Sequence, residues 1–413
     1  MRRWALIILV IALALLIVAS GFLAYEIFNS PNGPLGRQNG GSATANLGQT
    51  PVGQTQTPVT TRGCGIKKSG SGYTFSWLHV SNGNVLADTN CIVDLKGFNW
   101  SQTEFGNGVG GGPKTRINEQ HIAWYNQTFH MNVWRIPVNS VWWDQNVNVP
   151  LAGMTYQKWI QQVVKWAEMH GDYVILTKGP QFHNPPCGGS ESFCPSQNQA
   201  KKNIVINPAL YQQEVTTGQY IDSGVAMWTS IARLYANDPA VLYDSWNEMH
   251  NIDPAMWRQS ENTLIGAIRA QNPRSLIFLG GPNYKASINP LLRHDIPDFS
   301  QPNLIYDFHV YNGFQGVFDG KDCNEPQSPL WSGWPGVADE QVGFAQTHGK
   351  AVAFSEWGGC NDFDQYNQAI TSYARTHHII LVYYDETGMV VNDEIGGQLN
   401  TNGQKVQAAF ATW

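Results

Sequence analysis

The chain contains eight short runs of apolar and β-branched residues, separated by longer stretches with room for helices. Most runs are continuously apolar rather than alternating, as expected for strands covered on both faces. Between them, residues 155–169, 226–234 and 264–268 repeat apolar side chains at helical spacing. Eight such units predict an α/β fold, a closed (β/α)8 TIM barrel. The runs are residues 92–98, 132–136, 172–176, 240–246, 276–279, 304–308, 351–355 and 379–383.

Two glutamates follow the fourth and seventh of these runs. Glu248 ends the stretch 241–248, and Glu356 ends the stretch 351–356. The carboxyl ends of barrel strands share one rim, where such barrels carry their active sites. One carboxyl group can protonate a departing oxygen while a second supports the carbon that becomes cationic. The pair therefore predicts cleavage of a glycosidic bond, with Asn247 holding a sugar hydroxyl and Arg135 keeping the anionic partner charged.

Composition narrows the class of ligand. The net charge is -6 and only 14% of the 413 residues are charged, so no basic field for nucleic acid is expected. Aromatic residues, at 12% of the chain and including 16 tryptophans, exceed what core packing usually needs, and a neutral ligand with apolar faces is one explanation. The alternative is that large buried cores and rim packing account for half or more of them. Several tryptophans stand after strands or between elements as candidate sugar platforms: Trp100, Trp142, Trp143, Trp331 and Trp334.

The N-terminal segment predicts a membrane anchor. Arg2 and Arg3 precede residues 4–24, which are uncharged and mostly apolar. At about 1.5 Å per residue, a helix of this length spans a hydrocarbon core of about 30 Å. The basic residues favour a cytoplasmic N-terminus, so residues 1–28 are expected to form a single-pass signal anchor with the remainder extracellular. The small residues before Gly21 leave cleavage by signal peptidase, and hence secretion, open.

The remaining chain divides into a linker and one domain. Residues 29–63 are rich in Gly, Pro, Thr, Gln, Asn and Ser and predict a flexible linker, and residues 64–413 predict one catalytic domain. An N-terminal hairpin is expected from residues 73–80 and 85–88, joined by a tight turn at 81–84.

Six cysteines lie beyond the apolar segment, where an oxidising compartment favours disulfides. Neighbourhood in sequence favours the pairs Cys64–Cys91, Cys187–Cys194 and Cys323–Cys360 among fifteen possible pairings. A zinc site built from His183, Cys187 and Cys194 is the alternative.

The order of these residues along the runs resembles glycoside hydrolase family 5, the cellulase family within the clan of retaining barrel glycosidases. The resemblance covers residues 64–413 and rests on four features: Arg135 near the end of the second run, Asn247-Glu248 after the fourth, His309-Val310-Tyr311 after the sixth, and Glu356 after the seventh. It implies a β-1,4-linked glucan, or a related β-glucan or mannan, as substrate, without a cofactor or metal.

The resemblance also implies roles for individual residues. Glu248 would be the general acid/base, and Glu356 the nucleophile that forms a covalent glycosyl intermediate, with carboxyl groups about 5 to 5.5 Å apart. Tyr311 would contact Glu356 or the reacting sugar, and His309 would line the same subsite. The full substrate-binding set is Arg135, Asn247, His309, Tyr311, Trp357 and Tyr384.

The chain departs from the family pattern in three places, one of which is that residues 177–182 separate the third run from His183, where a histidine close to the strand is usual. Met249 and His250 follow the acid/base glutamate where proline is common, and Tyr383, Tyr384 and Asp385 stand where the eighth strand commonly ends in tryptophan. A tyrosine offers a smaller stacking face than tryptophan. Trp357 either lines the substrate cleft or packs as core beside Glu356.

The expected activity is therefore that of a monomeric, surface-anchored, retaining, endo-acting β-glycosidase. Three alternatives remain open: a mannanase or exo-β-glucosidase of the same family, an inactive carbohydrate-binding barrel, and a metal-dependent surface hydrolase. A panel of polysaccharides separates the first, binding without release of reducing ends identifies the second, and inhibition by chelators identifies the third.

Overall fold

The computed structural model describes residues 64–100, 103–104, 117–149, 152–179, 224–249, 254–282, 284–294, 296–311, 329–358, 366–384 and 398–413. These belong to one compact unit that runs from Val59 to Trp413. The predicted anchor and linker lie outside the described residues, as do His183, Cys187, Cys194, Cys323, Cys360 and Asp385. Among the helices in the described ranges, none combines the length and apolar character needed to cross a bilayer.

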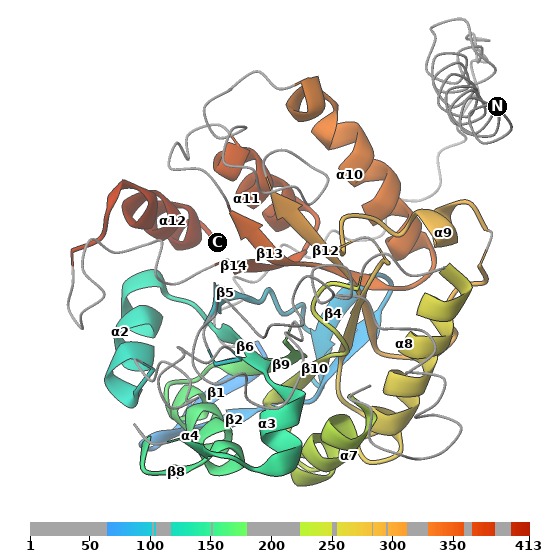
Figure 1. The fold of residues 1–413 in the computed structure, drawn as a ribbon. Helices are drawn as coiled ribbons and strands as arrows, with labels where there is room; N and C mark the ends of the chain where they lie inside the picture. The colour runs from blue at the N-terminus through green and yellow to red at the C-terminus, as the bar shows by residue number, and fades with distance from the viewer. Residues whose placement is uncertain are drawn as a thin grey trace, which may run out of the picture. The chain divides into compact units, whose positions relative to one another are not determined.

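Eight parallel strands close into a barrel, and each of the eight predicted runs contributes one of them (Figure 1). The order around the barrel is β10-β11-β12-β13-β14-β5-β6-β9, so chain neighbours are also neighbours in space. The strands are β5 (Lys96–Asn99), β6 (Val133–Val138), β9 (Tyr173–Lys178), β10 (Val241–Asp244), β11 (Ile277–Gly280), β12 (Leu304–Tyr311), β13 (Ala351–Gly358) and β14 (Ile380–Tyr383).

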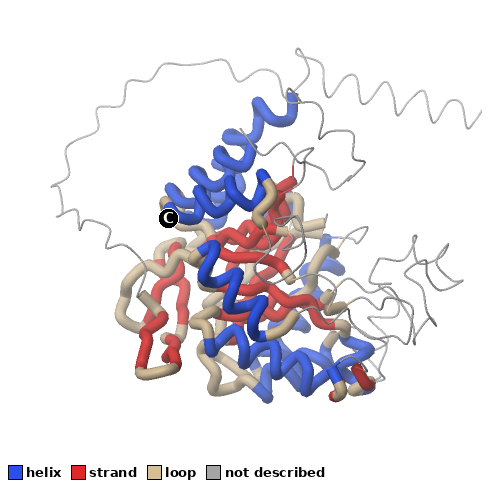
Figure 2. The backbone as a smooth tube through the Cα atoms, turned by 90° about the vertical axis from the view of Figure 1, so that its left-hand side faces the viewer, coloured by secondary structure: helices blue, strands red, loops and turns tan. Residues whose placement is uncertain are grey.

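Helices flank the strands on the outside, as the tube drawing shows (Figure 2). The predicted apolar stripe of 155–169 is helix α4, in which Trp159, Ile160 and Val163 are buried. The helices are α2 (Glu119–Phe129), α3 (Ser140–Gln145), α4 (Tyr156–Met169), α7 (Val225–Leu234), α8 (Pro254–Arg269), α9 (Asn289–Leu292), α10 (Pro329–Thr347), α11 (Tyr366–Thr376) and α12 (Thr401–Ala411). A short hairpin, β7 (Asn148–Val149) with β8 (Met154–Thr155), precedes α4.

Alternate residues of each strand serve two cores. One set, exemplified by Phe98, Trp134 and Tyr306, packs with the helices. The other set, exemplified by Ile175, Phe278 and Ile305, fills the barrel interior near the N-terminal ends of the strands. Burial on both faces explains why the runs read as continuously apolar.

Two hairpins precede the barrel. The predicted tight turn is confirmed: Asn82 and Gly83 have φ of 51° and 76° and join β3 (Leu78–Ser81) to β4 (Asn84–Ala87). The predicted first strand was too long, because residues 73–75 belong instead to β2 (Gly72–Phe75), which pairs with β1 (Ile66–Ser69). Leu78, Val85 and Ala87 pack with the lower interior of the barrel, so the β3–β4 hairpin covers that end.

The Cys64–Cys91 disulfide is confirmed, with Cα atoms 6.0 Å apart. It joins Cys64, two residues before β1, to Cys91, four residues after β4, and thereby brackets both hairpins. The other two predicted pairs involve cysteines outside the described residues.

Candidate active site

Polar side chains replace the apolar filling at the carboxyl ends of the barrel strands. Asn99, Arg135, Thr177, Asp244 and Asp307 all occupy positions that continue the interior-facing set of their strands. All five are buried, with exposures of 0% or 1%. Since buried charges require paired and hydrogen-bonded surroundings, this layer is expected to be a connected network.

Arg135 is the centre of that network. Its Nη1 donates to Glu356 Oε1 at 2.8 Å and to Asn99 Oδ1 at 2.7 Å. Its Nη2 donates to Asp244 Oδ2 at 2.7 Å and to Asn247 Oδ1 at 2.6 Å. Burial alone would lower the pKa of Arg135, but Asp244, Glu356 and Asp307 together raise it, so the guanidinium stays charged. Arg135 thus holds Glu356 in place and favours its ionised form.

Lys285 is a second buried cation, and the sequence analysis did not identify it. Its Nζ lies 2.7 Å from both Asp244 Oδ1 and Asp307 Oδ2. The loop after β11 delivers it through two consecutive left-handed residues, Tyr284 at φ 53° and Lys285 at φ 55°. A Cβ on Gly280 would lie 2.0 Å from Lys285 Cγ, so only glycine leaves room for this side chain.

A β-bulge in β13 brings Glu356 to the interior. Asp307 pairs with Ala353 and His309 with Glu356, so two steps along β12 correspond to three along β13. The same shift recurs on the other side, where Phe354 pairs with Leu381 and Trp357 with Tyr383. In a regular strand Ser355 and Glu356 would face opposite sides, but the bulge lets consecutive side chains both contact interior groups.

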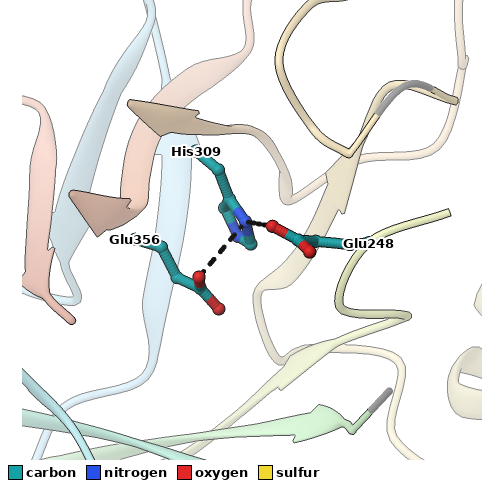
Figure 3. A group of neighbouring side chains, drawn as sticks. All are labelled: Glu248, His309 and Glu356. Atoms are coloured by element: carbon teal, nitrogen blue, oxygen red, sulfur yellow. Dashed lines mark hydrogen bonds and ion pairs between the residues drawn. The ribbon is translucent and has the colours of Figure 1, made fainter. Parts of the chain in front are cut away.

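Glu248 and Glu356 converge on His309, as Figure 3 shows. His309 Nδ1 lies 2.7 Å from Glu248 Oε1 and 3.5 Å from Glu356 Oε2. The three contacting atoms all lie within 4.8 Å of one another, so the two carboxylates face one small space. Glu248 comes from the segment after β10, His309 from β12 and Glu356 from β13.

The two glutamates have different surroundings. Burial, followed by the charge of Glu356, raises the pKa of Glu248 to about 8, although 30% of its side chain remains accessible from the rim. Glu356 is 7% exposed and is ion-paired with Arg135. Burial, with Lys285 and Arg135 nearby, places the pKa of His309 well below its ordinary value, so this imidazole is neutral at neutral pH. The structure therefore separates a protonated acid from a paired carboxylate.

The other predicted substrate-binding residues take various positions. Asn247 accepts from Arg135 and its backbone N donates to Lys178 O at 3.0 Å. Tyr311 ends β12 opposite Gly358, and its side chain lies outside what the structure describes. Trp357 is fully buried and packs edge to face on Tyr383, with ring centroids 4.8 Å apart. Tyr384 is half-buried, and its backbone N donates to Trp357 O at 2.9 Å.

Three of the candidate sugar platforms belong to the core. Trp100, Trp142 and Trp143 are 2%, 9% and 1% exposed, and Trp100 packs tilted against Trp134 at 5.6 Å. Their large apolar surface is used between the strands and the helices. The side chains of Trp331 and Trp334 lie outside the described part of α10.

Within the described ranges, one group of side chains has the spacing of a metal site: Glu248, His309 and Glu356. Arg135 already compensates Glu356, and Lys285 adds a second positive charge nearby. Because Glu356 is already paired with Arg135 and the raised pKa of Glu248 keeps its proton in place near neutral pH, the arrangement suits acid/base chemistry better than a resident metal ion.

Comparisons with known proteins bear on the family and the fold. Endoglucanase Z from Dickeya dadantii is 27% identical over 134 residues, which is 30% of this chain and 30% of that protein. The alignments thus span less than a third of the curated relatives. The catalytic domain of the major endoglucanase from Xanthomonas campestris superimposes with a TM-score of 0.58 at 19% identity, covering 82% of this chain and 100% of that one.

A second solved structure, the Thermobifida fusca endoglucanase catalytic domain in complex with cellotetraose, gives a TM-score of 0.55 at 15% identity over 81% of this chain and 97% of that one. At such identities the likeness establishes the fold. The family model for cellulase (glycosyl hydrolase family 5) matches residues 88–389, which is most of the chain. This chain therefore belongs to the cellulase family, glycosyl hydrolase family 5.

Proposed function

We propose that the protein is a retaining β-glycosidase in which Glu248 is the general acid/base and Glu356 the nucleophile. The observation that carries this proposal is the pairing itself: a carboxyl group with a raised pKa and an arginine-paired carboxylate face the same space, with oxygens within 4.8 Å. A short separation favours direct attack by the second carboxylate, because an inverting enzyme needs room for a water molecule between the two groups.

The reaction has two steps. In the first, Glu248 gives its proton to the departing glycosidic oxygen while Glu356 attacks the anomeric carbon, so the glycosidic C–O bond breaks and a glycosyl ester forms. In the second, Glu248 takes a proton from water, the water oxygen attacks the same carbon and the ester bond breaks. The charge of Glu356 raises the pKa of Glu248 in the free enzyme. Esterification removes that charge, so the pKa of Glu248 falls in the intermediate and the ionised Glu248 can act as a base.

The proposed substrate is a β-1,4-linked glucan cut internally. Support comes from the relatives, which are named endoglucanases, and from the Thermobifida fusca endoglucanase that was solved in complex with cellotetraose. Because Trp357 is buried, we expect a sugar at this rim to stack on other residues, such as the half-buried Tyr384. We further propose that residues 1–28 anchor a monomer whose catalytic domain is extracellular, on the strength of the apolar segment 4–24 and its flanking arginines.

The test compares Glu356→Ala and Glu248→Gln with Glu340→Ala, which changes an exposed glutamate on α10. Hydrolysis of glucan, mannan and xylan polymers is measured by reducing ends, and NMR follows the anomer released first. Both site variants are expected to lose at least about a thousandfold in kcat/KM, while Glu340→Ala retains activity. Retention of the β-anomer supports the mechanism. Undiminished turnover by Glu356→Ala, or release of the inverted anomer, would reject it.

A further inference from the structure

The two ring nitrogens of His309 have different partners. Nδ1 lies 2.7 Å from Glu248 Oε1, and Nε2 lies 3.3 Å from Ser355 Oγ. A neutral imidazole carries one proton, so one nitrogen donates and the other accepts. Which nitrogen holds the proton decides whether His309 donates to Glu248 or accepts from it.

Ser355 decides between the two forms, because its own proton is already committed. Its Oγ donates to Asp307 Oδ2 at 2.6 Å, and its backbone N donates to Asp307 Oδ1 at 3.0 Å. Lys285 Nζ donates to the same Asp307 Oδ2 at 2.7 Å. Three donors converge on Asp307, which is the environment of an acceptor-only carboxylate. Ser355 Oγ can therefore offer His309 only a lone pair.

We propose that Ser355, Asp307 and Lys285 are positioning residues that hold the proton of His309 on Nε2, so that Nδ1 accepts a hydrogen bond from the protonated carboxyl group of Glu248. The inference rests on the proposed function of Glu248 and extends it to three residues that do not touch the reacting atoms. The bulge in β13 is what makes the arrangement possible, since it allows Ser355 to contact Asp307 while the next residue, Glu356, contacts Arg135.

The tautomer sets the sign of the effect that His309 has on Glu248. A lone pair on Nδ1 hydrogen-bonds to the protonated carboxyl group and stabilises it, whereas an N–H at that position would stabilise the carboxylate. The first arrangement keeps Glu248 protonated in the resting enzyme, and this is the proton that the departing oxygen receives. After transfer, the same lone pair opposes the Glu248 carboxylate and makes it a stronger base toward the attacking water.

Other groups also act on Glu248, and they come from several elements. Glu356 and Asp307 favour the protonated form, whereas Lys285 and Arg135 favour the ionised form. The half-buried phenol of Tyr284, whose pKa is raised by burial and by Glu248, also lies near. These groups remain in a Ser355 variant, and Asp307 keeps Lys285 Nζ and the backbone N of residue 355 as donors. A change in Glu248 behaviour there therefore reports mainly on the His309 hydrogen bond. The charged and titratable groups around Glu248 are Arg135, Tyr284, Lys285, Asp307, His309 and Glu356.

The first experiment measures the tautomer directly and needs no activity. The full chain is prepared with ¹⁵N-histidine, and the signal of His309 among the 11 histidines is identified by its loss in His309→Gln. At about pH 7 the expected spectrum has a protonated Nε2 and an unprotonated Nδ1. A proton on Nδ1, or on both nitrogens, overturns the proposal whether or not the protein hydrolyses a glycan.

The second experiment removes the acceptor. Ser355→Ala is expected to shift the alkaline limb of the kcat/KM profile down by about one pH unit, the scale of one hydrogen bond. Ser355→Thr keeps the hydroxyl and is expected to reverse most of that shift. Ser275→Ala is the matched control, because Ser275 is equally buried but its Oγ donates to Val241 O near the N-terminal ends of the strands. A limb unmoved in Ser355→Ala contradicts the proposal.

Leaving-group dependence separates a positioning role from a merely structural one. Dinitrophenolate leaves a β-cellobioside without being protonated, whereas an aglycone that is a poor leaving group needs the acid. Near pH 8, Ser355→Ala should reduce turnover of the second substrate about tenfold more than turnover of the first. An equal reduction for both overturns the assignment. If Ser355→Ala fails to fold, the spectrum of the unaltered chain and the Ser355→Thr profile decide, and failure of the proposed function is recognised separately by absent hydrolysis in the unaltered chain.

Discussion

Lys285→Met tests the energetics of the buried charge network. The substitution keeps an unbranched side chain of similar length but removes the ammonium group that bridges Asp244 and Asp307. Asp244 retains Arg135 Nε and Nη2 at 3.1 and 2.7 Å. Among the residues that the structure describes, Asp307 retains the two donors of Ser355, at 3.0 and 2.6 Å, so the loss falls mainly on Asp307.

The expected loss in the free energy of unfolding is about 3 to 5 kcal/mol at neutral pH, the cost of leaving one member of a buried ion pair without its partner. The loss should depend on pH. Burial already raises the pKa of Asp307, and Lys285 opposes that rise, so removing Lys285 raises it further. A folded state that binds the proton more tightly than the unfolded state loses stability as pH rises through the folded pKa. Lys285→Met should therefore be less damaging near pH 5 than near pH 8.

The assay is urea unfolding of the full-length chain followed by tryptophan fluorescence at both pH values. Lys350→Met is the control for burial, because Lys350 is 7% exposed and donates to the backbone carbonyls of Phe299 and Gln301. Lys158→Met is the surface control and should change stability by less than about 0.5 kcal/mol. A loss below about 1 kcal/mol in Lys285→Met, or one that is equal at the two pH values, would refute the reasoning.

Two further predictions concern the framework. The hydrogen bond between His378 and Asp94, at 3.0 Å, raises the pKa of His378, so its stabilisation is complete below the unfolded pKa of about 6.5 and disappears as pH rises through the folded pKa. This contribution to stability amounts to less than about 1 kcal/mol, because the site is 33% exposed, and His378→Asn should abolish its pH dependence. If the melting temperatures of the unaltered chain and of His378→Asn change in parallel from acid to alkaline pH, the prediction is contradicted. Gly97→Ala places a Cβ 1.7 Å from Val133 O of the neighbouring strand and should cost at least about 3 kcal/mol in urea unfolding. Gly266→Ala on α8, whose Cβ meets nothing within 4 Å, should instead stabilise by about 0.5 to 1 kcal/mol, and similar effects of the two changes would be inconsistent with the strand packing.

The barrel could be predicted because its strands are buried on both faces. Runs such as 276–279 and 351–355 are apolar at every position or nearly so, and their number and spacing leave few other folds. The turn at Asn82-Gly83 was also readable, since both residues favour a positive φ. The β1–β2 hairpin was missed because Ile66 to Ser69 is mostly exposed and carries no apolar alternation.

The site was only partly readable for a different reason. The proposed catalytic pair lies at strand ends, which the sequence locates well. Lys285 reaches the network through a loop with two left-handed residues, which no periodic pattern predicts. Asp244 and Asp307 carried a usable signal, because Asp244 ends the otherwise apolar strand β10 and Asp307 stands between apolar residues in β12. Trp357 was ambiguous until the bulge in β13 was known, since the bulge sets which of its neighbours faces the interior.

The charge balance of the buried centre connects these features to the chemistry. Asp244, Asp307 and Glu356 face two cations, Arg135 and Lys285, so ionising all three carboxylates leaves one negative charge. Ionised Glu248 would add a second negative charge in a largely desolvated space, which is why the proton stays on Glu248 while Glu356, the proposed nucleophile, is free. Once the nucleophile is esterified, the balance returns to neutral and Glu248 can ionise. An additional cation would remove this alternation by stabilising both carboxylates at once. Two cations are thus few enough to keep Glu248 protonated and sufficient to keep Glu356, the proposed nucleophile, charged. The strand ends, the β13 bulge and the Lys285 loop together place these two cations at the centre.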